Sequence, residues 1–248
     1  MSAGRIAGFL FPMRPSVPEK LVALELGGLR NGNSIRGVVF DMDGVLVDSH
    51  PAHRAAWKIF LQSIGRPASD TEIDFILDGQ KRAEILRHFL GELSPEEIRD
   101  YGNRKDQMLR ELGTRLQPID GAIQFVFELR QAGVALGLAT SAARGRAEAT
   151  LSELGIKDYF DAIVTGDDVS VGKPDPSIYR MAAACLHEAP TRLLAFEDAV
   201  SGVQAALCAG FRCIGVGSGP RVEQLRAAGA GVVISDFNSV RLSDVFIH

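Results

Sequence analysis

Ile35-Arg36-Gly37-Val38-Val39-Phe40-Asp41-Met42-Asp43-Gly44 is the stretch that decides the fold. Residues 35–40 predict a buried strand, because a short apolar run that ends in a polar loop is typical of a strand covered on both faces. Similar runs return at 134–138, 162–164, 193–196, 213–216 and 232–234, with helical patterns at 121–131, 143–154, 176–186, 200–209 and 222–227. This alternation predicts an α/β fold with a parallel sheet covered by helices.

The stretch from Pro51 to Gln117 contains helical patterns and no convincing strand, so it predicts an inserted helical domain. Two Ser-x-x-Glu capping boxes begin helices in it, and four glycines mark helix ends: Ser69 to Glu72, Ser94 to Glu97, Gly65, Gly79, Gly91 and Gly113. We therefore expect an N-terminal extension at 1–34, a core made of 35–50 and 118–248, and a cap at 51–117.

Composition and charge exclude several classes of protein. The chain has 248 residues, of which 46% are hydrophobic and 23% charged, as in an ordinary globular protein. A net charge of −4 provides no field that would gather nucleic acid or anionic lipid. The apolar run Ile6 to Phe11 is too short for a signal peptide or a membrane span. We expect a cytoplasmic monomer that binds neither nucleic acid nor membranes, with Cys185, Cys208 and Cys213 as buried free thiols.

Polar side chains follow several of the predicted strands. Asp41 and Asp43 come after the first strand, Thr140 and Ser141 after the second, and the pair Glu197-Asp198 after a later one, while Pro174 fixes the backbone beside Lys173. In an open parallel sheet, ligands bind at the carboxyl ends of the strands. Each signal alone has an ordinary alternative: a solvated turn for the aspartates, helix capping for the hydroxyls and for Glu197-Asp198, and a surface position for Lys173.

Together the four signals favour phosphoryl transfer. This reaction requires a nucleophile, a hard cation, and a positive charge and a hydroxyl that hold the phosphoryl oxygens. Carboxylates spaced by two residues can divide the work, one as nucleophile or metal ligand and the other as proton donor and acceptor.

Asp41-Met42-Asp43-Gly44-Val45-Leu46, Thr140, Lys173-Pro174 and Glu197-Asp198 resemble the four motifs of the haloacid dehalogenase superfamily, over residues 35 to about 235. The resemblance implies a Rossmann-like sheet with helices on both faces, a required magnesium ion and an aspartyl-phosphate intermediate on Asp41. It makes Asp43 the general acid and base, and it places Thr140 and Lys173 on the phosphoryl group. Magnesium would be held by Asp41, the Asp43 main-chain carbonyl, Glu197 and Asp198.

The inserted helical segment is similar to the small cap of the β-phosphoglucomutase-like branch. That likeness makes His53, Arg82 and Lys105 substrate-binding residues together with Ser141. The alternatives are a packing role for His53 at the hinge of the cap, and solvated helix charges for Arg82 and Lys105. The run Ala139 to Arg144 differs from that of the mutase. The leading interpretation is therefore a magnesium-dependent phosphatase of a small phosphorylated metabolite, a sugar phosphate; a phosphosugar mutase and a non-catalytic module that binds such a metabolite are the alternatives.

Overall fold

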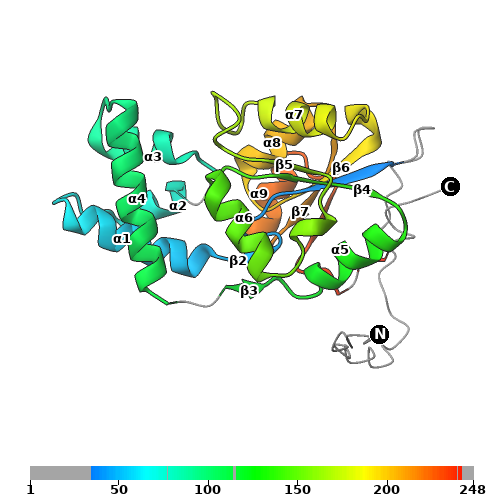
Figure 1. Cartoon of the computed structure of the whole chain (residues 1–248), viewed down its shortest axis with the longest axis horizontal. Helices are drawn as coiled ribbons and strands as arrows, with labels where there is room; N and C mark the ends of the chain where they lie inside the picture. The colour runs from blue at the N-terminus through cyan, green and yellow to red at the C-terminus, as the bar shows by residue number, and fades with distance from the viewer. Residues whose placement is uncertain (1–34, 77, 114–115, 239, 242–248) are drawn as a thin grey trace, which may run out of the picture.

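The computed structural model describes residues 35–241 except 77, 114–115 and 239 (Figure 1). The extension expected at 1–34 and the end of the expected core, 242–248, lie outside the described residues.

One parallel sheet forms the centre of the molecule. Its strands lie in the order β5 (Ala162–Val164), β4 (Ala135–Ala139), β1 (Gly37–Phe40), β6 (Leu193–Glu197), β7 (Arg212–Val216) and β8 (Val232–Ile234). Phe40 pairs with Leu138 of β4 on one side and with Phe196 of β6 on the other. The expected α/β fold is confirmed, and the order brings the carboxyl ends of β4, β1 and β6 together.

Helices cover both faces of this sheet. On one face, Phe40 packs in a cluster with Phe125 of α5 (Ala122–Gln131) and Leu151 of α6 (Arg144–Glu153). On the other, Val39 packs with side chains of α7 (Ser177–Cys185), α8 (Val200–Cys208) and α9 (Arg221–Ala227). Two short 3₁₀ turns are η1 (Lys157–Tyr159) and η2 (Pro190–Arg192). Successive residues of β1 face opposite sides, which is why a continuous apolar run marks the strand.

The segment between β1 and the rest of the sheet is helical. It contains α1 (His50–Ser63), α2 (Asp70–Ile76), α3 (Arg82–Leu90) and α4 (Pro95–Glu111), which lie beside the sheet in Figure 1. These helices share a separate apolar cluster that includes Trp57, Phe60 and Leu86. The expected capping box at Ser94 is formed, because the Glu97 N–H donates to Ser94 Oγ and the Ser94 N–H to Glu97 Oε2, at 3.2 and 2.8 Å.

Two expectations from the sequence are wrong. The stretch from Pro51 to Gln117 was expected to contain no convincing strand, but Gln117 begins β3 (Gln117–Pro118), which pairs antiparallel with β2 (Val47–Asp48). Strands of two residues leave no periodic pattern to detect. Cys185 and Cys208 are exposed, and Cys213 alone of the three thiols is buried. Within the described residues, no helix is long and apolar enough to cross a membrane.

Candidate active site

Asp41 lies directly beyond β1, and its backbone N–H donates to the Phe196 carbonyl of β6 at 3.0 Å. The residue is 6% exposed, so the alternative of a solvated turn is wrong for Asp41. Burial raises the pKa of Asp41 from 3.8 to about 7, with Lys173 opposing the rise and Glu197 and Asp43 adding to it.

Lys173 is 2% exposed and is not a surface lysine. Its ammonium donates to Asp41 Oδ1 at 2.7 Å, to the Ala139 carbonyl at 3.1 Å and to Glu197 Oε1. Burial alone would lower the pKa of Lys173, but the Asp41 and Glu197 carboxylates hold it above its ordinary value. The lysine therefore remains charged and fixed beside Asp41.

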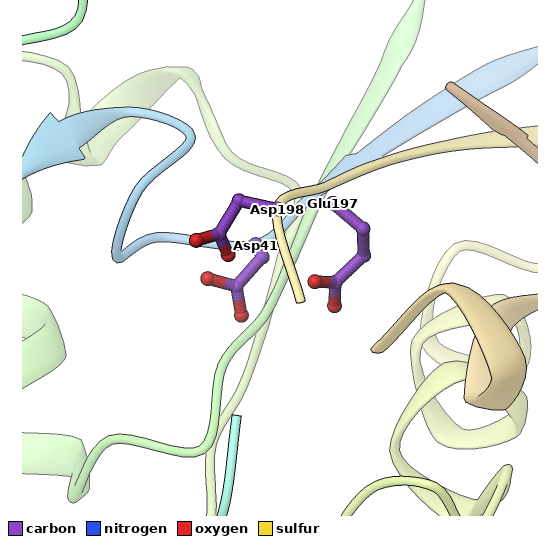
Figure 2. Close-up of side chains that lie close together, drawn as sticks. All are labelled: Asp41, Glu197 and Asp198. Atoms are coloured by element: carbon purple, nitrogen blue, oxygen red, sulfur yellow. The ribbon is translucent and has the colours of Figure 1, made fainter. Parts of the chain in front are cut away.

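Asp41, Glu197 and Asp198 form a buried carboxylate cluster where β1 and β6 end (Figure 2). Each offers one oxygen, and these oxygens lie within 4.8 Å of one another. Glu197 Oε2 is buried without a hydrogen-bond partner among the described residues, and burial with the neighbouring carboxylates raises the pKa of Asp198 well above its ordinary value. Glu197-Asp198 does not cap α8, whose N-cap is Ala199. Hard oxygen donors with excess negative charge and an unused oxygen fit Mg²⁺.

Glycines allow these carboxylates to approach the backbone closely. Gly44 has φ = +76°, and a Cβ there would overlap the Asp198 carboxylate. A Cβ at Gly202 in α8 would overlap the carboxylate of Glu197. Any larger residue at either position would displace a candidate metal ligand.

Asp43 is held by residues from both sides of the pocket. Arg146 of α6 pairs with both oxygens of Asp43, with Nη1 at 2.9 Å from Oδ1, and the Ser49 hydroxyl also donates to Oδ1. His53 Nε2 lies 3.9 Å from Oδ1. Burial would raise the pKa of Asp43, but Arg146, with help from His53 and Ser49, holds it well below its usual range.

Arg146 was not predicted from the sequence. One signal could have identified it: Arg144 and Arg146 stand in the first turn of α6, where a positive charge opposes the helix dipole. An anion near by would offset this unfavourable interaction.

The two hydroxyls after β4 have different partners. Thr140 is 1% exposed, and its Oγ1 accepts from the Ala142 N–H at 3.1 Å. Ser141 Oγ donates to the Gly79 carbonyl, on the loop between α2 and α3, at 2.7 Å. Both residues line the pocket that contains Asp41.

The helical segment contributes His53, Arg82 and Lys105 to the same pocket, which has a volume of about 90 Å³. Lys105 is 3% exposed, so it is not a solvated helix charge. Its ammonium lies 3.4 Å from His53 Nδ1 and 3.0 Å from Asp106 Oδ1, and Arg82 also pairs with Asp106. Burial lowers the pKa of Lys105 to about 8, although Asp106 opposes this shift.

The loop between α2 and α3 is hydrogen-bonded to the core. Asp78 Oδ1 accepts from the Val200 N–H and from Arg221 Nη2, both at 3.2 Å. Lys81 Nζ donates to the Val169 carbonyl at 2.6 Å, and the Gly172 N–H donates to Glu84 Oε1, in the first turn of α3, at 3.1 Å. These contacts hold the loop and the start of α3 against α8 and the chain segment that precedes α7.

Comparisons with known proteins identify the family of this chain. Residues 35–210 match the family described as haloacid dehalogenase-like hydrolase. The validoxylamine A 7'-phosphate phosphatase of Streptomyces hygroscopicus subsp. limoneus is 33% identical over 82% of this chain and 94% of the relative. The β-phosphoglucomutase of Bacillus subtilis is 34% identical over 75% of this chain and 84% of the relative. A crystal structure of mutant CbbY from Rhodobacter sphaeroides in complex with xylulose-(1,5)bisphosphate superposes with a TM-score of 0.76 and 28% identity, over 86% of this chain and all of that one.

The matched region contains every core residue expected to carry chemistry, from Asp41 to Asp198. The relatives include both a phosphatase and a mutase, as the motifs and the helical insert predict. The chain is therefore an enzyme of the haloacid dehalogenase-like hydrolase family, in its β-phosphoglucomutase-like branch.

Proposed function

We propose that this phosphoric monoester hydrolase is a magnesium-dependent phosphatase that hydrolyses a small phosphorylated metabolite, a sugar phosphate, through an aspartyl phosphate on Asp41. The observation that carries the proposal is the buried group of Asp41, Lys173, Glu197 and Asp198, with its unused Glu197 oxygen. Relatives named as a validoxylamine A 7'-phosphate phosphatase and as a β-phosphoglucomutase support the substrate class.

In the proposed reaction, an oxygen of Asp41 attacks phosphorus and the bond from phosphorus to the sugar oxygen breaks. Asp43 gives a proton to that leaving oxygen. Asp43 then takes a proton from a water molecule, which attacks phosphorus and releases phosphate and the free Asp41 carboxylate. Lys173 and Thr140 hold the phosphoryl oxygens.

Magnesium would be held by Asp41, Glu197, Asp198 and the main-chain carbonyl of Asp43. When bound, it supplies positive charge that offsets the repulsion between the Asp41 carboxylate and an anionic phosphate. Lys173 contributes positive charge to the same purpose, because its ammonium contacts both Asp41 and Glu197.

We also propose that residues 51–117 are a cap domain on a core of 35–50 and 118–248. The separate apolar cluster of α1 to α4 supports this division. His53, Arg82, Lys105 and Ser141 would contact the substrate, as their place in the pocket supports. We further propose that the enzyme acts as a monomer in the cytoplasm.

A phosphosugar mutase is the second candidate. The hydrogen bonds of Asp78 with Val200 and Arg221, and of Glu84 in α3 with Gly172, favour it, because a cap held against the core excludes water from a covalent intermediate. Such an enzyme would return the phosphoryl group of Asp41 to a sugar hydroxyl.

One experiment separates the two candidates. The protein is incubated with Mg²⁺ and a panel of phosphorylated sugars, with and without a sugar bisphosphate primer, and both free phosphate and isomerised sugar phosphate are measured. We expect phosphate release that does not require the primer. Isomerisation dependent on the primer would identify a mutase. The absence of both products would contradict both candidates.

A further inference from the structure

Glu84 lies in the first turn of α3 and uses its two carboxylate oxygens for two different parts of the chain. Oε2 accepts from the Lys81 N–H at 3.0 Å, at the start of its own helix, and Oε1 accepts from the Gly172 N–H at 3.1 Å. Gly172 directly precedes Lys173. We propose that Glu84 and Lys81 are positioning residues for Lys173, because they hold the loop at 169–172 from which this lysine reaches the phosphoryl group. The inference rests on the proposed function, in which Lys173 has that role.

The loop before Lys173 has little support of its own. It lies between β5 and α7, and Val171 is 51% exposed. Among the described residues, no backbone group hydrogen-bonds to the Val169 carbonyl or to the Gly172 N–H. Backbone polar groups inside a protein require partners. For these two groups, the partners are side chains of the helical segment.

Two opposite charges of the helical segment bind this loop. The Lys81 ammonium donates to the Val169 carbonyl at 2.6 Å and to the Ser170 carbonyl at 3.4 Å. The Glu84 carboxylate accepts from the Gly172 N–H two residues further on. Hydrogen bonds with one charged partner are roughly twice as strong as those between neutral groups. The pair therefore holds both ends of the loop.

Gly172 allows the helix to come this close. A Cβ at Gly172 would lie 2.5 Å from Lys81 Cγ and 2.8 Å from Glu84 Oε2, so a larger residue would push α3 away from the loop. The Gly172 carbonyl accepts from the Asp175 N–H at 3.0 Å. Both backbone groups of Gly172 are thus bound, and the chain enters Lys173 in a fixed direction.

The position of Lys173 determines how well its ammonium can act. Its Nζ lies 2.7 Å from Asp41 Oδ1 and 3.1 Å from the Ala139 carbonyl. A misplacement of about 1 Å in such a group can lower the rate by ~10². Movement of the backbone at Gly172 is passed to Lys173, the next residue. The rate on a substrate that needs only the core site should therefore depend on Glu84, although Glu84 belongs to the helical segment.

A double-mutant cycle tests the inference. With Mg²⁺ and p-nitrophenyl phosphate, kcat is measured for the wild type, Glu84→Ala, Lys173→Ala and the double variant, and also for Glu84→Gln and Lys81→Met. Glu97→Ala is the matched control. Glu97 has the same place in α4 that Glu84 has in α3, and its Oε2 accepts from the Ser94 N–H at 2.8 Å. It is exposed, and among the described residues it accepts no hydrogen bond from the core.

We expect Glu84→Ala to lower kcat by about ten- to a hundredfold. In the Lys173→Ala background the same substitution should change kcat by no more than about twofold, because a residue that acts through Lys173 has no effect once Lys173 is absent. Glu84→Gln keeps one acceptor oxygen and should fall between the wild type and Glu84→Ala. Lys81→Met should also lower kcat, and Glu97→Ala should retain the wild-type rate.

Two results overturn the inference while Lys173→Ala is itself inactive. One is a Glu84→Ala variant with the wild-type kcat. The other is a loss of the same factor with and without Lys173, since this indicates only a structural role in the helical segment. If Glu84→Ala does not fold, Glu84→Gln and Lys81→Met decide in its place by the same cycle.

Failure of the proposed function gives a different pattern. A Lys173→Ala variant with wild-type rates refutes the role of Lys173, and the inference with it. If the protein hydrolyses no p-nitrophenyl phosphate, the cycle is repeated on the calorimetric affinity for inorganic phosphate in Mg²⁺. Weaker binding in Glu84→Ala only when Lys173 is present then supports the inference, and unchanged binding overturns it.

Discussion

The carboxylate cluster predicts that Asp41→Asn inactivates the enzyme and stabilises the metal-free protein. Asp41, Glu197 and Asp198 are buried together, and Lys173 is the cation that contacts two of them. An amide of nearly the same shape cannot attack phosphorus, so turnover should be lost. The same amide removes one buried negative charge, so the free energy of unfolding should increase at alkaline pH.

The size of this increase follows from the pKa of Asp41. Burial is the main cause of its rise from 3.8 to about 7. At roughly 1.4 kcal/mol per unit of pKa, ionised Asp41 costs the folded state up to about 4 kcal/mol. Because the folded protein holds this proton more tightly than the unfolded chain, the cost is absent below pH 3.8, grows between pH 3.8 and 7, and is complete above pH 7.

Urea unfolding with a chelator at pH 5 and pH 8 measures the effect. Asp41→Asn should exceed the wild type by up to ~4 kcal/mol at pH 8 and by about half as much or less at pH 5. Added Mg²⁺ should stabilise the wild type more than the variant, which lacks one proposed ligand. Asp158→Asn, an exposed carboxylate outside the pocket, is the control.

A variant that is less stable than the wild type at pH 8 in chelator would refute the reasoning. So would a stability difference that is the same at both pH values, since it would not come from the ionisation of Asp41. An Asn variant that keeps more than about a tenth of the wild-type rate would separately exclude a covalent role for Asp41.

Three further predictions concern the cations of the site. Lys173→Ala should lower kcat by about 10²–10³, and steady-state rates within threefold of the wild type would contradict its role. Arg82→Ala should lower kcat/KM for the true sugar phosphate by roughly ten- to a hundredfold and affect p-nitrophenyl phosphate far less; equal losses would indicate that Arg82 acts through the stability of the helical segment. Because the pKa of Lys105 is lowered to about 8, its charge is lost as the pH rises through that value, so KM for the sugar phosphate should increase above pH 8; a pH profile unchanged in Lys105→Met would contradict this.

The sheet could be predicted from sequence because each of its strands is locally distinct. Parallel strands covered on both faces are continuous apolar runs, and the expected runs at 162–164 and 232–234 coincide with β5 and β8. The core site was predictable for a related reason. Asp41, Thr140 and Glu197 stand where their strands end, and the geometry of a parallel sheet brings such positions together.

Contacts between distant side chains could not be predicted in this way. The pairing of Arg146 with Asp43 joins residues 103 positions apart, and nothing in the local pattern of either one specifies the other. The same is true of the Ser141 hydroxyl, which donates to the Gly79 carbonyl across 62 positions. The exposure of Cys185 and Cys208 also depends on how helices α7 and α8 lie on the sheet.

Asp41 and Asp43 show how two carboxylates spaced by two residues can be driven in opposite directions. Burial beside other acids raises the pKa of Asp41, whereas Arg146 holds that of Asp43 well below its usual range. A nucleophile must be ionised and a general acid protonated, so the substrate-free site favours the reverse of the states that the proposed reaction needs. Cation binding among Asp41, Glu197 and Asp198 would favour the ionised form of Asp41, and loss of the pairing with Arg146 would allow Asp43 to take up a proton. In the proposed reaction, both changes would have to precede phosphoryl transfer.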